Sequence, residues 1–318
     1  MFDHILVPLD GSNLAECVLP HVRIMAEAMG SKITLFHSLE RPDQSTGLYP
    51  VSPLDWHMRR AEAKLYLDRI SEELSETLSE VSCVLVEGSA AESVIEYAHG
   101  NDVDFMILSS HGRSGLSGWN ISSVVQKIVL RSYTSMLIVR AYGAQTNVSG
   151  YSRIMVALDC SNRAESAVPM GVMLACAQNA ELLLAHVLKA PEMPRRLPPS
   201  AEDIKLSEQL IERNQAVAEE YLKQLTAQLA SETVLPATRL TVGRNVAATL
   251  ENMVKSEEIE LVILSAHGYE GDTSWPYGSV AVSFIAYGST PLLVMQDIPF
   301  SRVARTRAEK AAGESSGH

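Results

Sequence analysis

The stretch Ser265-Ala-His-Gly268-Tyr-Glu-Gly-Asp-Thr-Ser-Trp-Pro-Tyr-Gly278-Ser279 decides the fold of this chain. It follows the apolar run Leu261-Val-Ile-Leu264 and precedes a second apolar segment, residues 280–287. This order predicts a buried strand, a glycine-containing loop and the start of a helix. Such a loop presents unpaired backbone N–H groups at a helix N-terminus, which favours the binding of a phosphate.

The same pattern occurs earlier in the chain, as Ser109-Ser-His-Gly112-Arg-Ser-Gly-Leu-Ser-Gly-Trp-Asn-Ile-Ser122-Ser123, directly after Phe105-Met-Ile-Leu108. Two copies of one pattern indicate a duplication, and other residues recur at nearly constant intervals. The matching pairs are Asp10 and Asp159, Pro20 and Pro169, Gly30 and Asn179, His37 and His186, and Trp119 and Trp275.

Short apolar runs alternate with helical segments along both copies, which predicts an α/β fold. The runs are apolar on both faces, as expected for a parallel sheet covered by helices on each side. We therefore predict two tandem, doubly wound domains. The first spans residues 1–143, followed by a linker at 144–150, a second domain at 151–297 and a polar tail at 298–318. Pro20 should break its helical segment, and Gly30 should end it.

Composition limits the classes of function. The 318 residues carry a formal net charge of -12, which argues against nucleic acid or an anionic membrane as the main partner. No apolar run approaches the roughly 20 residues that span a bilayer, so we expect no membrane insertion. The four cysteines show no zinc or C-x-x-C spacing. These features favour a cytoplasmic protein.

On these residues the chain resembles the universal stress protein family in its tandem two-domain form. The family pattern is G-x-x-G, nine residues, then G-S or G-T. The second copy has Ser265-x-x-Gly268 and then Gly278-Ser279, while the first has Ser109-x-x-Gly112 and then Ser122-Ser123. The resemblance implies a five-stranded parallel sheet of order 3-2-1-4-5 in each half. It also implies a pseudo-dimer within the chain, formed by pairing of the two fifth strands.

The resemblance further implies an ATP site in each half, where the strand order reverses. The aspartate after the first strand would contact the nucleoside, the main chain after the second strand the adenine, and the glycine loop the phosphates. ADP or AMP would fit the same site, with or without Mg²⁺. In the second copy the residues are Asp159, Val187, Ser265, His267, Gly268, Gly278, Ser279 and Val280. In the first copy they are Asp10, Ser38, Ser109, His111, Gly112, Ser122, Ser123 and Val124.

Both copies depart from the family pattern. Serine replaces the first loop glycine at positions 109 and 265, and the third glycine of the first copy is Ser122. These losses rank the second copy as the better nucleotide site, although Glu270 and Asp272 in its loop would repel phosphates. The alternative interpretation is structural: Asp10 and Asp159 would cap the next helix, and the loop histidines would only bond loop carbonyls.

The sequence shows no nucleophile elbow, no P-loop, and no lysine in either phosphate loop. We therefore expect a nucleotide-binding regulatory or sensor protein of the stress response without efficient catalysis. One alternative is a slow ATPase in which Asp10 or Asp159 helps to hold Mg²⁺. Another is a scaffold that works by surface contacts without nucleotide. A homodimer of whole chains is a further expectation, and the sequence does not identify its surface.

Overall fold

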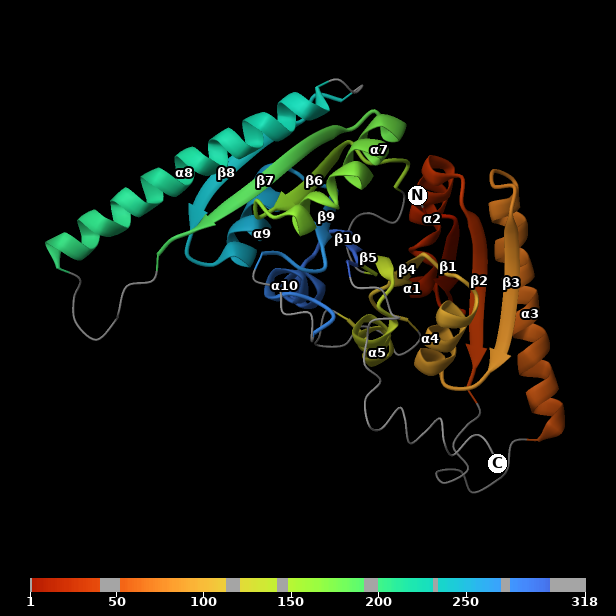
Figure 1. The fold of residues 1–318 in the computed structure, drawn as a ribbon. Coiled ribbons are helices and arrows are strands. Elements are labelled where there is room, and N and C mark those ends of the chain that lie inside the picture. Colours follow the sequence, from red (N-terminus) through yellow and green to blue (C-terminus); the bar gives the residue numbers. More distant parts are fainter. Residues whose placement is uncertain are drawn as a thin grey trace.

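Ten strands form one continuous sheet in the part of the chain that the structure describes (Figure 1). This computed structural model describes residues 2–40, 52–112, 121–141, 148–191, 200–230, 234–269 and 275–297. The strands of the first half are β1 (His4–Pro8), β2 (Lys32–Leu39), β3 (Val81–Glu87), β4 (Phe105–Ser109) and β5 (Ser135–Val139). Those of the second half are β6 (Arg153–Leu158), β7 (Glu181–Lys189), β8 (Ala237–Gly243), β9 (Leu261–Ser265) and β10 (Leu292–Met295).

The strand order is β3-β2-β1-β4-β5-β10-β9-β6-β7-β8. Each half is parallel and has the predicted order 3-2-1-4-5. The halves join where β5 and β10 pair antiparallel, with Leu137 opposite Leu293. This pairing agrees with the expectation that the fifth strands meet, and it covers one edge of each five-stranded sheet.

The helices begin and end at residues with a clear local cause. Pro20 and Pro169 stand in the first turns of α2 and α7 and separate these helices from α1 and α6. Gly30 and Asn179 end α2 and α7 in the left-handed conformation, with φ of 68° and 52°. In the first half the helices are α1 (Asn13–Glu16), α2 (Leu19–Met29), α3 (Pro53–Ser75), α4 (Ala90–Gly100) and α5 (Ser123–Ser132). In the second half they are α6 (Asn162–Glu165), α7 (Val168–Gln178), α8 (Ala201–Leu229), α9 (Val246–Ser256) and α10 (Ser279–Tyr287).

The buried core forms two layers, one on each face of the sheet. Successive strand residues alternate between them: Ile5 and Val7 belong to one layer and Leu6 to the other. Helices α2, α3, α7 and α8 cover the first layer, and α4, α5, α9 and α10 cover the second. Each layer contains residues of both halves, so the core runs without interruption through the whole sheet.

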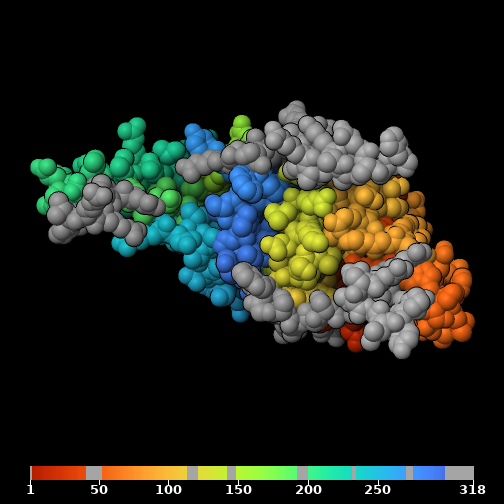
Figure 2. All heavy atoms as spheres, turned by 90° about the horizontal axis from the view of Figure 1, so that it is seen from below, coloured from red at the N-terminus to blue at the C-terminus, as the bar shows by residue number. Residues whose placement is uncertain are grey.

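A buried arginine fastens the two halves together beside the β5–β10 pair. The guanidinium of Arg140, which follows β5, donates to the carbonyls of Phe284 and Ile285 at 2.7 and 3.1 Å. These carbonyls lie in the last turn of α10, where a cation is favourable. Figure 2 shows the segment of α10, in blue, directly beside that of α5, in yellow-green, and both helices belong to the same core layer.

A second contact between the halves involves a buried histidine. Nδ1 of His21, on α2, lies 2.5 Å from the hydroxyl of Tyr151, just before β6. Both side chains are buried, at 1% and 2% exposure. Burial lowers the pKa of His21 to about 4, from an ordinary value of 6.5. The pair is therefore stable only while the imidazole is neutral.

The free energy of unfolding should consequently rise with pH between about 4 and 6.5. In this window the unfolded chain binds a proton at His21 that the folded chain does not. The stabilisation that depends on neutral His21 is therefore complete above pH 6.5. The loss by pH 4 should be about 3 kcal/mol. We expect His21→Gln to flatten the pH dependence by that amount in denaturant titrations. His57→Gln, on the exposed side of α3, is the control, and an equal slope for wild type and His21→Gln would contradict the prediction.

Candidate functional site

Each half brings the turns after its first and fourth strands together at the carboxyl edge of the sheet. These strands are neighbours, β1 beside β4 and β6 beside β9, and the strand order reverses between them. Open α/β sheets bind ligands at such a point. The predicted site residues of both copies all belong to the described residues, and most of them lie at this edge.

In the second half, Asp159 ties the turn after β6 to the loop after β9. Its Oδ1 accepts from the backbone N–H and the hydroxyl of Ser161, at 3.0 and 2.5 Å. Its Oδ2 accepts from the backbone N–H of Tyr269, at 2.6 Å. Ser161 itself caps α6. The alternative that the aspartate caps the helix is therefore wrong, because the aspartate holds the cap serine and the loop instead.

The same contact explains why glycine follows the loop histidine in both copies. A Cβ atom on Gly268 would lie 2.1 Å from Oδ2 of Asp159, and one on Gly112 would lie 2.1 Å from Oδ2 of Asp10. In the first half, Oδ1 of Asp10 accepts from the N–H and the hydroxyl of Ser12, at 3.0 and 2.6 Å. The two halves thus build the same carboxylate–loop contact.

The serines that replace the first loop glycine point into the protein. Ser109, the last residue of β4, is buried, and its hydroxyl lies 2.8 Å from the Leu14 carbonyl and 2.7 Å from the His111 carbonyl. Ser265 ends β9 in the same way, and its buried hydroxyl has no hydrogen-bond partner among the described residues. The extra bulk of serine is therefore accommodated inside the fold in both halves.

The loop histidines are both buried but are held differently. Nδ1 of His267 lies 2.6 Å from Oδ1 of Asp297, and Nε2 lies 2.7 Å from the Trp275 carbonyl. Each ring nitrogen therefore has an oxygen partner, and the ring of His267 is held at both of its edges. In the first half, His111 lies 3.2 Å from the hydroxyl of Ser110. Asp297, which follows β10, was not predicted from the sequence, and no spacing rule relates it to the loop.

The far end of each loop closes onto its beginning. The N–H of Ser122 donates to the Ser110 carbonyl at 2.8 Å, and that of Gly278 donates to the Ala266 carbonyl at 2.7 Å. Both residues have extended backbones, with φ of -72° and -73°. A Cβ on Gly278 would meet only ordinary contacts, at 3.5 Å and beyond. Serine at position 122 therefore adopts its backbone conformation without strain.

The helices that follow the loops differ in how their N-termini are capped. Ser122 accepts a hydrogen bond from Val125 at 3.3 Å and so occupies one of the first N–H groups of α5. Gly278 offers no side chain, and α10 has no side-chain cap. The first N–H groups of a helix lack partners within the helix. Ser279, Val280 and Ala281 therefore present more free donors than Ser123 and Val124 do in the first half.

The residues predicted to meet the adenine lie inside strands, not after them. Ser38 belongs to β2 and Val187 to β7, since both strands run further than the sequence indicated. The Phe36 carbonyl accepts from Leu9 beyond the end of β1, at 2.8 Å. Carbonyls of alternate strand residues point to the same side, so that of Ser38 points beyond the end of β1. The main chain at Ser38 therefore still borders the site.

Several loop residues fall outside the described part of the chain. They are Arg113, Gly115, Gly118, Trp119, Glu270 and Asp272. Trp275 is described, and its side chain is 68% exposed. Among the described residues, no cluster of three or more histidine, cysteine, aspartate or glutamate side chains could hold a metal ion. In the same residues, no helix has the length and apolar character to cross a membrane.

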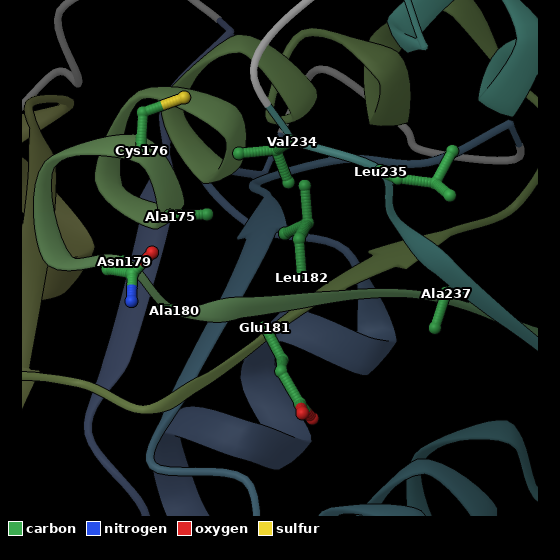
Figure 3. A pocket seen from close by; sticks show the side chains of 9 residues that line it. All are labelled: Ala175, Cys176, Asn179, Ala180, Glu181, Leu182, Val234, Leu235 and Ala237. Atoms are coloured by element: carbon green, nitrogen blue, oxygen red, sulfur yellow. The ribbon is translucent and has the colours of Figure 1, made fainter.

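Two cavities lie away from the strand ends. The first, of about 660 Å³, lies where α7 ends and β7 begins, and Figure 3 shows its lining side chains. The second, of about 570 Å³, lies between α3 and β3 and is lined by charged side chains such as Arg60 and Lys64. No predicted site residue lines either cavity, so both are separate from the candidate site.

Comparison with known proteins gives a consistent result. The family model described as the universal stress protein family matches twice, over residues 1–140 and 150–296. A universal stress protein of Methanocaldococcus jannaschii is 26% identical over 155 residues, which are 44% of this chain and 96% of the relative. The crystal structure of a universal stress protein from Archaeoglobus fulgidus covers 92% of this chain and 98% of its own, with a TM-score of 0.65 and 16% identity. A functionally unknown protein from Pseudomonas aeruginosa covers 98% of each chain, with a TM-score of 0.66 and 13% identity.

The carboxylate–loop contact makes a paired prediction about two glycines of one loop. Gly268→Ala should lower the free energy of unfolding by about 1–3 kcal/mol, because its Cβ displaces Asp159. Gly278→Ser should be neutral, or should stabilise by up to about 1 kcal/mol, because the extended backbone suits a serine, which caps a helix as Ser122 does in the first half. Denaturant unfolding of the two variants measures the difference. Equal effects of the two changes would rule out the contact as the reason for glycine at 268.

Proposed function

Because the chain belongs to the universal stress protein family, in its tandem two-domain form, we propose that it is an ATP-binding regulatory protein of the stress response without efficient catalysis. One nucleotide site would lie in each half, within residues 1–143 and 151–297, with the linker at 144–150 between them. The observation that carries the proposal is the uncapped N-terminus of α10, located where the strand order reverses.

Free N–H groups at a helix N-terminus favour an anion, through hydrogen bonds and through the helix dipole. In the second half the donors belong to Ser279, Val280 and Ala281. The described residues on either side of residues 270–274 are held in place, Tyr269 by Asp159 and Gly278 by its hydrogen bond to the Ala266 carbonyl. Groups that are already held in place lose little conformational entropy when a ligand binds. These features support placing the phosphates at this turn.

The nucleoside would occupy the space beside Asp159 and the end of β7. The two oxygens of Asp159 accept three hydrogen bonds, and a carboxylate offers about four lone-pair sites. One site is thus left for a ribose hydroxyl. The main chain at Val187, beyond the end of β6, would recognise the adenine edge. The equivalent groups in the first half are Asp10 and Ser38.

The second half is proposed as the stronger site. No side chain caps the N-terminus of α10. In the first half the Ser122 hydroxyl accepts a hydrogen bond from the backbone N–H of Val125, so this donor is already occupied. The remaining proposed ligands of the second site are Ser265, His267 and Gly268, which shape the loop, and those of the first are Ser109, His111, Gly112, Ser123 and Val124. Mg²⁺ would enter with the phosphates, since the described residues contain no ready cluster of metal-binding side chains.

Binding without efficient hydrolysis fits the side chains at the turn. Phosphoryl transfer requires a group that positions the attacking water and cations that stabilise the developing charge. The described loop residues supply buried histidines that are already bonded, and both loop sequences lack lysine. The slow ATPase remains the alternative function, and release of phosphate from ATP over hours would favour it.

Two substitutions at Ser279 test the role of the α10 amides. Proline is favourable as the first residue of a helix, and Gly278 has the extended backbone that a residue before proline adopts. Ser279→Pro should thus keep the helix and remove one N–H donor. Loss of one hydrogen bond to a charged group should weaken ATP binding by roughly 10- to 100-fold in calorimetric titrations.

Ser279→Ala is the matched control, because it removes the hydroxyl and keeps the N–H. It should change the affinity much less than Ser279→Pro does. Circular dichroism spectra of both variants should match that of the wild type. The proposal fails if wild-type protein binds none of ATP, ADP and AMP, or if the proline variant binds ATP as well as the alanine variant.

A further inference from the structure

The cavity between α3 and β3 combines basic side chains with an apolar inner part. Its volume is about 570 Å³, within the range of roughly 300–1,000 Å³ that is typical of small-molecule sites. Helix α3 forms one wall, and β3, the outer strand of the first half, forms the other (Figure 1). No residue of the candidate nucleotide site lines this cavity, so a ligand bound here would be additional to a nucleotide.

The basic residues of the cavity lie along one face of α3. His57, Arg60 and Lys64 are spaced so that their side chains point to the same side of the helix over two turns. Asp68 supplies one negative charge to the lining, against the two positive charges of Arg60 and Lys64. Arg60 also lies 3.7 Å from Oε1 of Glu87, but such a solvent-accessible pair contributes little. The wall is therefore positive on balance, in a chain whose net charge is -12.

Apolar side chains line the inner part of the cavity. Leu67, on α3, is 1% exposed and belongs to the core, and Leu85, on β3, packs against the same core layer. Burial raises the pKa of the Cys83 thiol, so this side chain is uncharged at neutral pH. A ligand that fills the cavity would thus meet positive charge on the side of α3 and hydrocarbon further in.

The second half shows that the fold does not require this basic wall. Helices α3 and α8 align, because their buried residues have the same spacing: Ala63, Leu67 and Ile70 match Ala218, Leu222 and Leu225. In this alignment the positions of the three basic residues of α3 are occupied in α8 by Glu212, Gln215 and Glu219. Three basic positions of the first half are thus acidic or neutral in the second. The positive charge is therefore not needed to pack the helix on the sheet, and it favours an anionic ligand.

We propose that the cavity between α3 and β3 binds a free organic anion with an apolar tail, such as the carboxylate of a fatty acid. The head group lies between Arg60 and Lys64, which are one helical turn apart, and the tail covers Leu67, Cys83 and Leu85. Burial of the tail supplies affinity, and the two cations select the charge of the head group. This site is independent of the proposed nucleotide site, and failure of either leaves the other standing.

Calorimetric titration of the full chain with dodecanoate, kept below its micelle concentration, tests the proposal. We expect a Kd of roughly 10–100 μM. Dodecyltrimethylammonium, which has the same tail and a cationic head group, should bind at least about tenfold more weakly. Arg60→Gln with Lys64→Glu installs the residues of the second half and should weaken dodecanoate binding by about tenfold or more. Arg59→Gln, on the same helix but outside the cavity lining, is the control and should bind like the wild type. Melting temperatures should not change, because all these side chains are exposed.

Two exposed cysteines locate the bound tail, since Cys83 lines this cavity and Cys176 lines the one beside the end of α7. At ten times its Kd, dodecanoate should slow alkylation of Cys83 by iodoacetamide by roughly tenfold and leave the rate at Cys176 unchanged. The proposal is overturned if the cationic analogue binds as tightly as dodecanoate, if the double variant keeps the affinity of the wild type, or if Cys83 is not protected. Tighter binding to phosphatidylglycerol vesicles than to free dodecanoate would also overturn it, because the ligand would then be a membrane surface.

Discussion

The carboxylate of Asp159 lies against a backbone position that has room only for glycine, and the candidate site is arranged around that contact. Asp159 follows β6 and Gly268 follows β9, so the contact joins the two strands between which the order reverses. Gly268 and Tyr269 are thereby held at the sheet edge, on the chain that continues to α10. The first half repeats the contact with Asp10 and Gly112, which makes it a property of the fold and not of one loop sequence.

Helix α10 connects the candidate site with the join between the halves. Its N-terminus is free at the strand ends, while its last turn is held by Arg140 from the first half. The residues on either side of Arg140 are themselves bonded to Ser110, where the first loop begins. Both loops are thus attached to the same central region, and the antiparallel β5–β10 pair fixes its geometry.

Local sequence signals predicted the parts of the fold that depend on neighbouring residues. Pro20, Gly30 and Asn179 set helix ends as expected, because their conformational limits act locally. The resemblance supplied the strand order. Asp297 and Arg140 were missed, since their partners are distant in sequence and no pattern marks them. We expected the replacement of the third loop glycine by Ser122 to weaken the first site. A sequence motif does not reveal that the backbone at this position is ordinary extended chain, which serine adopts as readily as glycine.

The most direct test of the account is hydrogen–deuterium exchange of the full chain with and without ATP. The proposed ligand binds main-chain amides at the strand ends. We therefore predict slower exchange in the turn from β9 into α10, and weaker protection in the turn from β4 into α5. Protection confined to either cavity, between α3 and β3 or beside the end of α7, would contradict it, as would no change anywhere in the chain.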